Sequence, residues 1–283
     1  MSMNEISLAI DRFMDLTAWE MTPPRAYGPF HLIFTFVGIA LCIFLAYKLR
    51  NLSERGHRIL MFCVGLTLLI FEVYKQLFHY YHINDHEYNF GIFPFHLCSV
   101  PMYLCLIVPF LKKGKLQSGI YGFMTTFNLL GGIMTFIEPS GITLDHLTLT
   151  LHAFIWHMSL IFIGFYLIAS GRFAKTSKDY WSAAVTFVVL CGVAFIINLS
   201  LWEVSDGGIN MFFVGPRNSS LAVFKQISEA AGWYVSTLLY IPAVCAGAYL
   251  LYLPAHLYAK KKGMIGEVNE SQPEKEKEEC PVG

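Results

Sequence analysis

Charge is scarce in this sequence. Asp, Glu, Lys and Arg make up 14% of its 283 residues, whereas apolar residues make up 55% and aromatic residues 16%. An average soluble domain has about 25% charged residues, so the mean hydropathy of +0.51 fits a polytopic membrane protein instead. The 20 basic and 20 acidic residues balance, and we therefore expect no nucleic-acid partner.

A cysteine framework and a secretory leader are also missing. The 7 cysteines are odd in number and include no CxxC pair, which argues against a disulfide scaffold or a structural zinc site. The first residues include acidic side chains and no basic start followed by an apolar run, so we expect no cleavable signal peptide. No motif points to a cofactor, and we predict none.

Long apolar runs are abundant. About 20 residues are needed to cross a hydrocarbon core of ~30 Å. Runs of that length fall at 29–49, 58–80, 91–111, 118–137, 147–170, 181–203 and 229–258. The sequence therefore predicts an all-α polytopic membrane protein, a bundle of seven transmembrane helices.

Two segments flank this bundle. Ile6, Ile10 and Phe13 have the i, i+4, i+7 spacing of an amphipathic helix. The stretch "GEVNESQPEKEKEECPVG" is charged and poor in aromatic residues, which is typical of disorder. The expected organisation is an N-terminal amphipathic segment over 1–28, a transmembrane domain over 29–258 and a disordered cytoplasmic tail over 259–283.

Basic residues mark one side of the predicted bundle. Lys and Arg accumulate in short cytoplasmic loops of membrane proteins. Here they cluster after the first, third, fifth and seventh runs, at 48–58, 112–115, 172–178 and 260–262. This pattern predicts an integral multi-pass protein with its N-terminus outside and its C-terminus inside, in the plasma membrane if the source is bacterial.

Polar residues within the runs share one depth. With a rise of about 1.5 Å per residue, the expected orientation puts most of them in the outer half of the membrane. An ionisable group in hydrocarbon costs about 2.5–3.5 kcal/mol, so we expect a shared pocket instead of contact with lipid. A network that only joins helices is the alternative, at about 0.6 kcal/mol per bond. The predicted pocket residues are Glu72, Lys75, Gln76, His96, Cys98, Asn128, His152, His157, Asn198 and Trp202.

Cys98 is the candidate nucleophile because it is the cysteine with a polar neighbourhood, in "FPFHLCSVP". A thiol ionises near pH ~8.5 and so needs little activation, although a free cysteine is most often a small buried hydrophobe. His96 lies about 200° away around a regular helix, so the base must come from another helix. His152 and His157 are the candidates, and the depth of His157 favours it over His152.

Two other groupings have simpler interpretations. Glu72 and Lys75 are spaced i, i+3 and are expected to neutralise each other as a structural ion pair. His79, His82 and His86 have an HxxHxxxH spacing, but the residues around them resemble a loop with a turn. We therefore predict no metal site.

Four motifs carry a resemblance to a known family. They are "FPFHLCSVPMYLCLIVPF", "FIWHMSLIFIGFYLI", "INLSLW" and "GPRNSSLAVF…AAGWYVSTLLYIPAV". In order and spacing they resemble the YwaF-like integral membrane proteins, which include transmembrane protein 164, over about residues 30–255. The resemblance implies a phospholipid acyltransferase with a cysteine nucleophile and a histidine. By motif these are Cys98 of "HLC" and His157 of "WHMSL", with His96 and Asn198 lining the pocket.

The expected function is therefore acyl transfer between phospholipids or other acyl lipids, through a cysteine acyl-enzyme on the outer-leaflet side. Asn128, Asn198 or Lys75 is the expected oxyanion donor. A lipid-ester hydrolase is one alternative, and a transporter or receptor-like lipid-binding protein is another. A transport path also needs polar groups in the inner half of the membrane, where the runs offer few. The oligomeric state stays open.

Overall fold

Six helices in the structure are long and apolar enough to cross a membrane. The structure is a computed structural model that describes residues 3–265, and its regular elements there are all helical. The six are α2 (Pro29–Leu49), α3 (Glu54–Phe78) with the π-turn η1 (His79–Ile83), the unit α5–η4–α6 (Lys115–Phe123, Met124–Asn128, Leu129–Ile137), α7 (Leu147–Ala169), α8 (Ser177–Ser200) and α10 (Trp233–Lys261). The prediction of an all-α, multi-pass membrane protein is confirmed.

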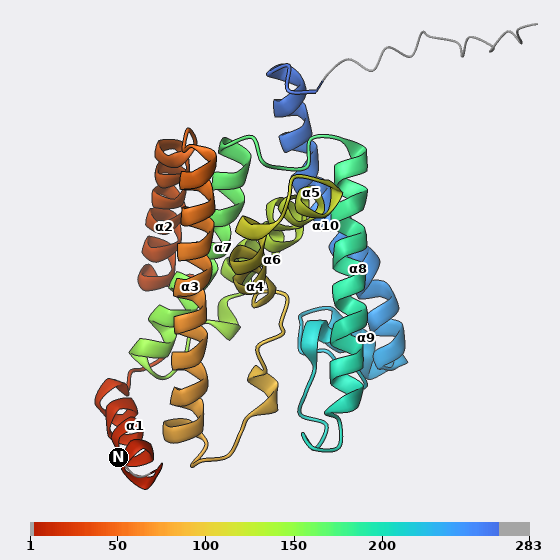
Figure 1. Cartoon of the computed structure of the whole chain (residues 1–283). Helices are drawn as coiled ribbons and strands as arrows, with labels where there is room; N and C mark the ends of the chain where they lie inside the picture. The colour runs from red at the N-terminus through yellow and green to blue at the C-terminus, as the bar shows by residue number, and fades with distance from the viewer. Residues whose placement is uncertain (1–2, 266–283) are drawn as a thin grey trace, which may run out of the picture.

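The third predicted helix, over 91–111, is not continuous. After the short 3-10 turn η2 (Phe90–Ile92) the chain is irregular until α4 (Val100–Ile107), which continues into η3 (Val108–Phe110). Pro94 has no N–H and disfavours a helical residue before it. Pro101 lies in the first turn of α4, where a proline is tolerated. Two prolines thus replace the first half of a predicted helix by an irregular segment of backbone that rises from η1 to α4 (Figure 1).

The remaining elements lie at the end of the bundle where this irregular segment begins. They are the N-terminal helix α1 (Met3–Thr17), the turns η5 (Pro139–Gly141) and η6 (Met211–Phe213), and the short helix α9 (Phe224–Ala231). The buried side chain of Met14 holds α1 in a small cluster with Phe78 and Leu149. Most of the predicted tail, residues 266–283, lies outside the described residues.

The basic loops gather at the opposite end. Glu54, at the start of α3, pairs with Arg172 at 3.2 Å and with Lys113 at 4.0 Å. His256 of α10 bonds to the backbone oxygen of Lys175 at 2.6 Å. These contacts join the loops that follow α2, η3 and α7 to the last part of α10 (upper end of Figure 1). The four basic clusters of the sequence therefore share one end of the molecule.

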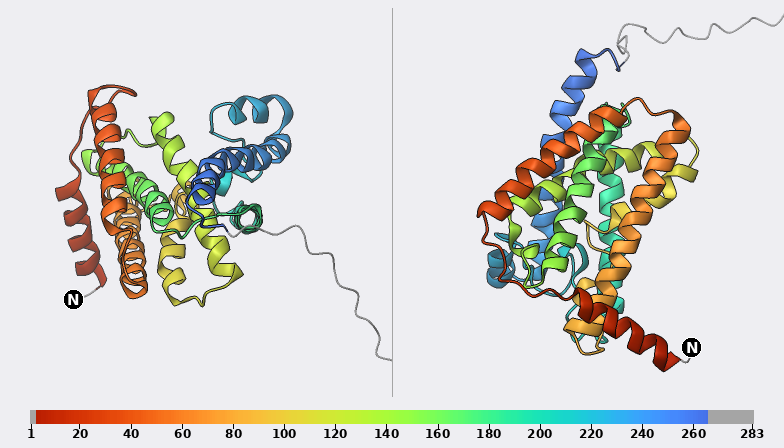
Figure 2. Two further views of the ribbon diagram at one scale, coloured as in Figure 1. Left: turned by 90° about the horizontal axis from the view of Figure 1, so that it is seen from above. Right: turned by 90° about the vertical axis from the view of Figure 1, so that its left-hand side faces the viewer.

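The core lies between the central helices. Most residues of α5–η4–α6 and of α7 are buried, whereas few residues of α2 and α10 are. Seen along the bundle, α2 and α3 lie on one side and α8 and α10 on the other (Figure 2). A Cβ atom on Gly132 or Gly164 would approach the facing helix to about 3.0–3.1 Å, so α6 and α7 pack in close contact through glycines.

Candidate functional site

Side chains from neighbouring helices hold the irregular segment 90–99 in place. Gln76 of α3 donates its Nε2 hydrogen to the carbonyl of Ile92 at 2.8 Å. The hydroxyl of Tyr103 donates to the carbonyl of Pro94, also at 2.8 Å. Backbone groups that a helix would satisfy internally are thus satisfied by side chains, as membrane-depth irregular backbone requires.

The same segment contains His96 and Cys98, which have different roles in it. The Nε2 of His96 donates to the carbonyl of Gly91 at 2.9 Å and closes the segment on itself. The indole Nε1 of Trp156, on α7, donates to the carbonyl of Cys98 at 3.0 Å. This bond ties the candidate nucleophile to the helix that carries both candidate bases.

His157 follows Trp156 directly on α7. Its Nδ1 lies 2.7 Å from the carbonyl of Ala153, one turn earlier. A carbonyl oxygen only accepts, so Nδ1 carries a hydrogen and Nε2 of the neutral ring has a free lone pair. That tautomer is the one a base needs.

Gly131 and Gly132 of α6 lie between the Cys98 segment and α7. A Cβ atom on Gly131 would lie 3.8 Å from Cδ2 of Leu97, and one on Gly132 would lie 3.4 Å from the backbone oxygen of His157. The two glycines therefore lie close to Leu97, which precedes Cys98, and to the backbone of His157. The absence of side chains here leaves α6 close to both.

The Cys98 thiol is not paired with a histidine in this conformation. The thiol accepts from its own backbone N–H and pairs with the side chain of Ser99, and no hydrogen bond between described residues joins Cys98 Sγ to His152 or His157. The N–H group of Leu97 has no acceptor among the described residues. A free backbone donor beside a thiol can stabilise an oxyanion on a carbon bonded to sulfur.

The expected ion pair of Glu72 and Lys75 is present. The Lys75 Nζ lies 2.9 Å and 3.0 Å from the two carboxylate oxygens, and Gln76 Nε2 donates to the same carboxylate at 2.7 Å. Glu72 is only 3% exposed. The charge of Lys75 reaches Cys98 and His157 electrostatically, so the pair lies beside the candidate site.

His152 connects helices. Its Nε2 donates to the carbonyl of Phe71 on α3 at 3.0 Å, and its ring stacks on Trp156 with centroids 5.7 Å apart. It is 9% exposed, so it lies inside the protein even though it comes near the start of α7. These contacts fix the position of Trp156 and hence of the Cys98 carbonyl.

The two pocket asparagines bind backbone. Asn128 donates to the carbonyl of Leu160 at 3.2 Å and links η4 to α7. Asn198 clamps Met211, donating to its carbonyl at 3.0 Å and accepting from its N–H at 2.7 Å. Asn128 uses both amide hydrogens, the second on the carbonyl of Met124 at 3.3 Å, which argues against it as an oxyanion donor, whereas Asn198 keeps one amide hydrogen without a described acceptor. Trp202 lies farther out, packed against the loop after α8.

Sequence reasoning missed the strained pair Phe212 and Phe213. Their φ angles are 55° and 58°, a region that costs a non-glycine residue about 1–3 kcal/mol. The ring of Phe212 lies 5.8 Å from Phe95 and that of Phe213 6.4 Å from His96. Positive φ in aromatic residues leaves no pattern in a sequence, so only the three-dimensional structure identifies this contact.

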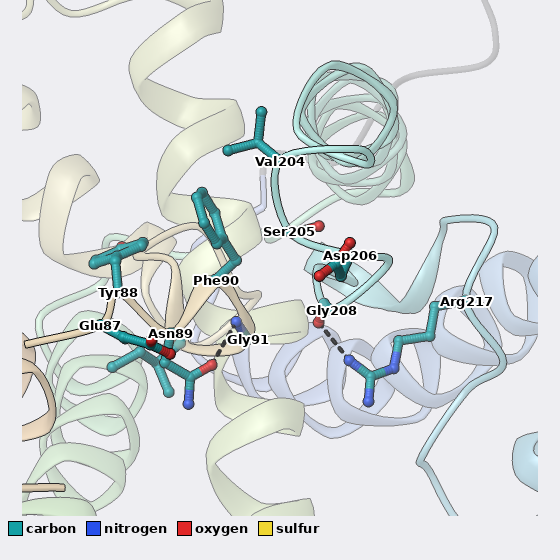
Figure 3. A pocket seen from close by; sticks show the side chains of 11 residues that line it. Glu87, Tyr88, Asn89, Phe90, Gly91, Val204, Ser205, Asp206, Gly208 and Arg217 are labelled. Atoms are coloured by element: carbon teal, nitrogen blue, oxygen red, sulfur yellow. Dashed lines mark hydrogen bonds between the residues drawn. The ribbon is translucent and has the colours of Figure 1, made fainter. Parts of the chain in front are cut away.

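A cleft of about 580 Å³ opens at the start of segment 90–99 (Figure 3). One wall is the loop 87–92, and the other comes from the loop after α8, including Asp206 and Arg217. Gly91 and Ile92 line the cleft, and their carbonyls are the ones that bind His96 and Gln76. The cleft and the Cys98 segment are therefore parts of one region.

Two histidines at this end of the bundle, His82 and His146, pair with carboxylates. His82 Nδ1 lies 2.8 Å from Asp15 and His146 Nδ1 lies 3.0 Å from Asp145. Within residues 3–265 no group of three or more His, Cys, Asp or Glu side chains is arranged to hold a metal ion.

Comparison with known proteins links most of the chain to one family. The model of the TMEM164 family matches residues 26–252, a range that includes all the transmembrane helices except the end of α10. No curated protein and no solved structure matches the chain.

Proposed function

The chain belongs to the TMEM164 family, and from this premise we propose that it is a membrane-embedded acyltransferase. It moves a fatty acyl chain between phospholipids through a thioester on Cys98, with His157 as the base. The resemblance read from the sequence motifs is confirmed at the level of the family. The reaction and its residues are the proposal.

One observation carries the proposal most directly. The hydrogen bond of 3.0 Å from Trp156 to the Cys98 carbonyl joins the backbone of Cys98 to α7 at the residue before His157. A nucleophile and its base need hydrogen-bond reach in the reacting complex, and in the free enzyme this contact is often longer. Rotation of the Cys98 side chain away from Ser99 is the movement that would close it.

The first half-reaction follows from these groups. His157 Nε2 takes the thiol proton, and the thiolate attacks the carbonyl carbon of a lipid ester. The N–H group of Leu97, which has no acceptor among the described residues, stabilises the oxyanion. Collapse breaks the carbon–oxygen bond, the leaving lysolipid alcohol takes the proton from His157, and the acyl chain stays on Cys98.

The second half-reaction reverses the first with a new acceptor. A lysolipid hydroxyl gives its proton to His157 and attacks the thioester carbonyl. The carbon–sulfur bond breaks, and the proton returns to sulfur. Water as acceptor makes the same site a lipid-ester hydrolase, which releases free fatty acid. A site within the membrane, where water is scarce, supports transfer over hydrolysis.

The direct test is the mass of the intact protein after incubation with phospholipid vesicles. We expect one added acyl chain, located on Cys98 by fragmentation, that a lysolipid removes. Cys98→Ala should carry no adduct and Cys105→Ala, a buried cysteine of α4, should carry it normally. An unmodified native protein that nevertheless transfers acyl chains would contradict the thioester.

We further propose seven crossings, with N-terminus outside and C-terminus inside. Segment 90–99 together with α4 and η3 then makes the third crossing, and the end with the basic loops is cytoplasmic. If the source is bacterial, the membrane is the plasma membrane. Lys115→Cys should react with an impermeant maleimide only from inside, and Ser140→Cys only from outside. Both positions are exposed, and reversed labelling would invert the orientation.

A further inference from the structure

We propose that the cleft between loop 87–92 and the loop after α8 binds the head group of a zwitterionic phospholipid. The inference rests on the acyltransferase proposal and adds a binding site for the head group of its substrate. Arg217 takes the phosphate, Asp206 and Glu87 take the ammonium group, and the rings of Tyr88 and Phe90 pack against it.

The charges in the cleft fit a molecule with both signs. One guanidinium, that of Arg217, and two carboxylates, those of Asp206 and Glu87, line it. None of the three forms an ion pair with another described residue, and all three are exposed. Their sum is negative, which disfavours an anionic lipid or a free phosphate and favours a ligand that brings a cation of its own.

Arg217 is held in place by the protein. One guanidinium nitrogen, Nη1, donates to the carbonyl of Gly208 at 2.5 Å. The other nitrogens make no hydrogen bond to a described residue. A guanidinium with free parallel N–H groups is suited to a phosphate, which it binds through two oxygens. Figure 3 shows Arg217 and Asp206 on the wall opposite Tyr88 and Phe90.

The aromatic wall supplies the second element. The rings of Tyr88 and Phe90 meet edge to face with centroids 5.0 Å apart, and Glu87 precedes them. Aromatic faces attract quaternary and primary ammonium groups, most strongly beside a carboxylate. Burial and the nearby Glu72 raise the pKa of the Tyr88 hydroxyl, so it stays neutral at physiological pH and adds no third negative charge.

One wall of the cleft and Cys98 belong to one continuous segment of the chain. In a glycerophospholipid the phosphate and the acyl esters are joined only by a glycerol unit. In the protein, Ile92 lines the cleft and Cys98 follows six positions later in the same strand of backbone. A head group in the cleft would leave the esters of the lipid at the start of the segment that carries the thiol.

The test measures lipid binding by native mass spectrometry of the detergent-solubilised full chain in the Cys98→Ala background, so that no turnover occurs. Phosphatidylcholine should bind at least tenfold more tightly than phosphatidylglycerol. Arg217→Gln should weaken phosphatidylcholine binding about tenfold, the usual effect of losing a hydrogen bond to a charged group. Lys225→Gln, an exposed cation outside the cleft, should leave it unchanged.

Water-soluble glycerophosphocholine distinguishes the head group from the acyl chains. It should compete with phosphatidylcholine in the Cys98→Ala protein and lose this effect in the protein that also carries Arg217→Gln. Asp206→Asn should reduce the preference for phosphatidylcholine over phosphatidylglycerol, whereas Glu203→Gln, an exposed neighbour outside the cleft, should not. Unchanged thermal unfolding of each variant shows that it is folded.

Three results would overturn the head-group site. Phosphatidylglycerol could bind as tightly as phosphatidylcholine, glycerophosphocholine could fail to compete, or Arg217→Gln could leave the affinity for phosphatidylcholine unchanged. An acyl adduct on Cys98 together with any of these leaves the acyltransferase proposal intact. Head-group binding that depends on Arg217, with no adduct on Cys98 in the native background, contradicts the acyltransferase proposal alone.

Discussion

Two buried polar regions at opposite ends of the bundle differ in how completely their groups are paired. At the basic end, both ring nitrogens of His57 have partners, Nδ1 with the Tyr166 hydroxyl at 3.0 Å and Nε2 with that of Tyr121 at 2.7 Å. The His57 and Tyr166 rings also stack, with centroids 5.7 Å apart. This cluster joins three regular helices and leaves none of its ring nitrogens free.

At the other end, pairing is incomplete. Gln76 Oε1, His79 Nδ1 and Asn128 Oδ1 are buried without a hydrogen-bond partner among the described residues. The backbone there is irregular, and two phenylalanines have positive φ. Unpaired polar atoms and strain cost stability, and natural proteins keep them where they serve a function. The comparison therefore favours the region around segment 90–99 as the candidate site and the His57 cluster as a structural joint.

The largest expected effect is that of Cys98→Ala. It should abolish acyl transfer between phospholipid and lysolipid, because no thioester forms, while thermal unfolding stays near that of the native protein. Cys105→Ala is the matched control, since Cys105 lies in α4, directly after segment 90–99, and is 0% exposed in the core. Transfer at the native rate by Cys98→Ala would remove the main reason to treat the two regions differently.

His157→Ala should lower the transfer rate about 10²–10⁴-fold, the usual share of general acid–base catalysis. Lipid binding should change little. His152→Ala is the informative companion, because its ring donates to the Phe71 carbonyl and its loss should mainly lower the unfolding temperature. If His152→Ala removes the chemistry and His157→Ala only stability, the assignment of the base is reversed.

The sequence predicted the long helices because their apolar runs are long enough to span a membrane. It also predicted the pair of Glu72 and Lys75, since an i, i+3 spacing on one helix fixes their distance. These features depend on local sequence. The gathering of the basic loops at one end follows from the alternating direction of the helices.

The break in the third run was not predictable in the same way. Residues 91–99 are apolar enough to continue α4, and Pro94 and Pro101 alone are also compatible with a loosened helix. The outcome depends on Gln76, Tyr103 and Trp156, which bind the carbonyls that the broken helix frees. Such long-range acceptors are set by tertiary packing, and so are the cleft and the strained φ of Phe212.

The His57 cluster gives a prediction whose expected effect is intermediate in size. His57→Phe leaves the hydroxyls of Tyr121 and Tyr166 without their partner, and the free energy of unfolding should fall by about 1–3 kcal/mol. The transfer rate of the folded protein should not change. Chemical denaturation in detergent together with the transfer assay measures both. A stable His57→Phe protein with no transfer activity would show that the His57 cluster takes part in function.

The smallest effect concerns the bond that joins the two halves of the site. Trp156→Phe keeps an aromatic ring against His152 but removes the N–H that donates to the Cys98 carbonyl at 3.0 Å. A hydrogen bond of this kind contributes about 0.5–1.5 kcal/mol, so kcat should fall about three- to tenfold. KM should stay the same, because the carbonyl positions the thiol and does not touch the lipid. Trp181→Phe, an exposed tryptophan of α8, controls for loss of an indole.

Stability and kcat together distinguish a structural role of this bond from a catalytic one. A fall in stability with an unchanged kcat would show that the bond only supports the fold, as the bonds of His57 do. A fall in kcat at unchanged stability is expected of a bond that holds the nucleophile beside its base.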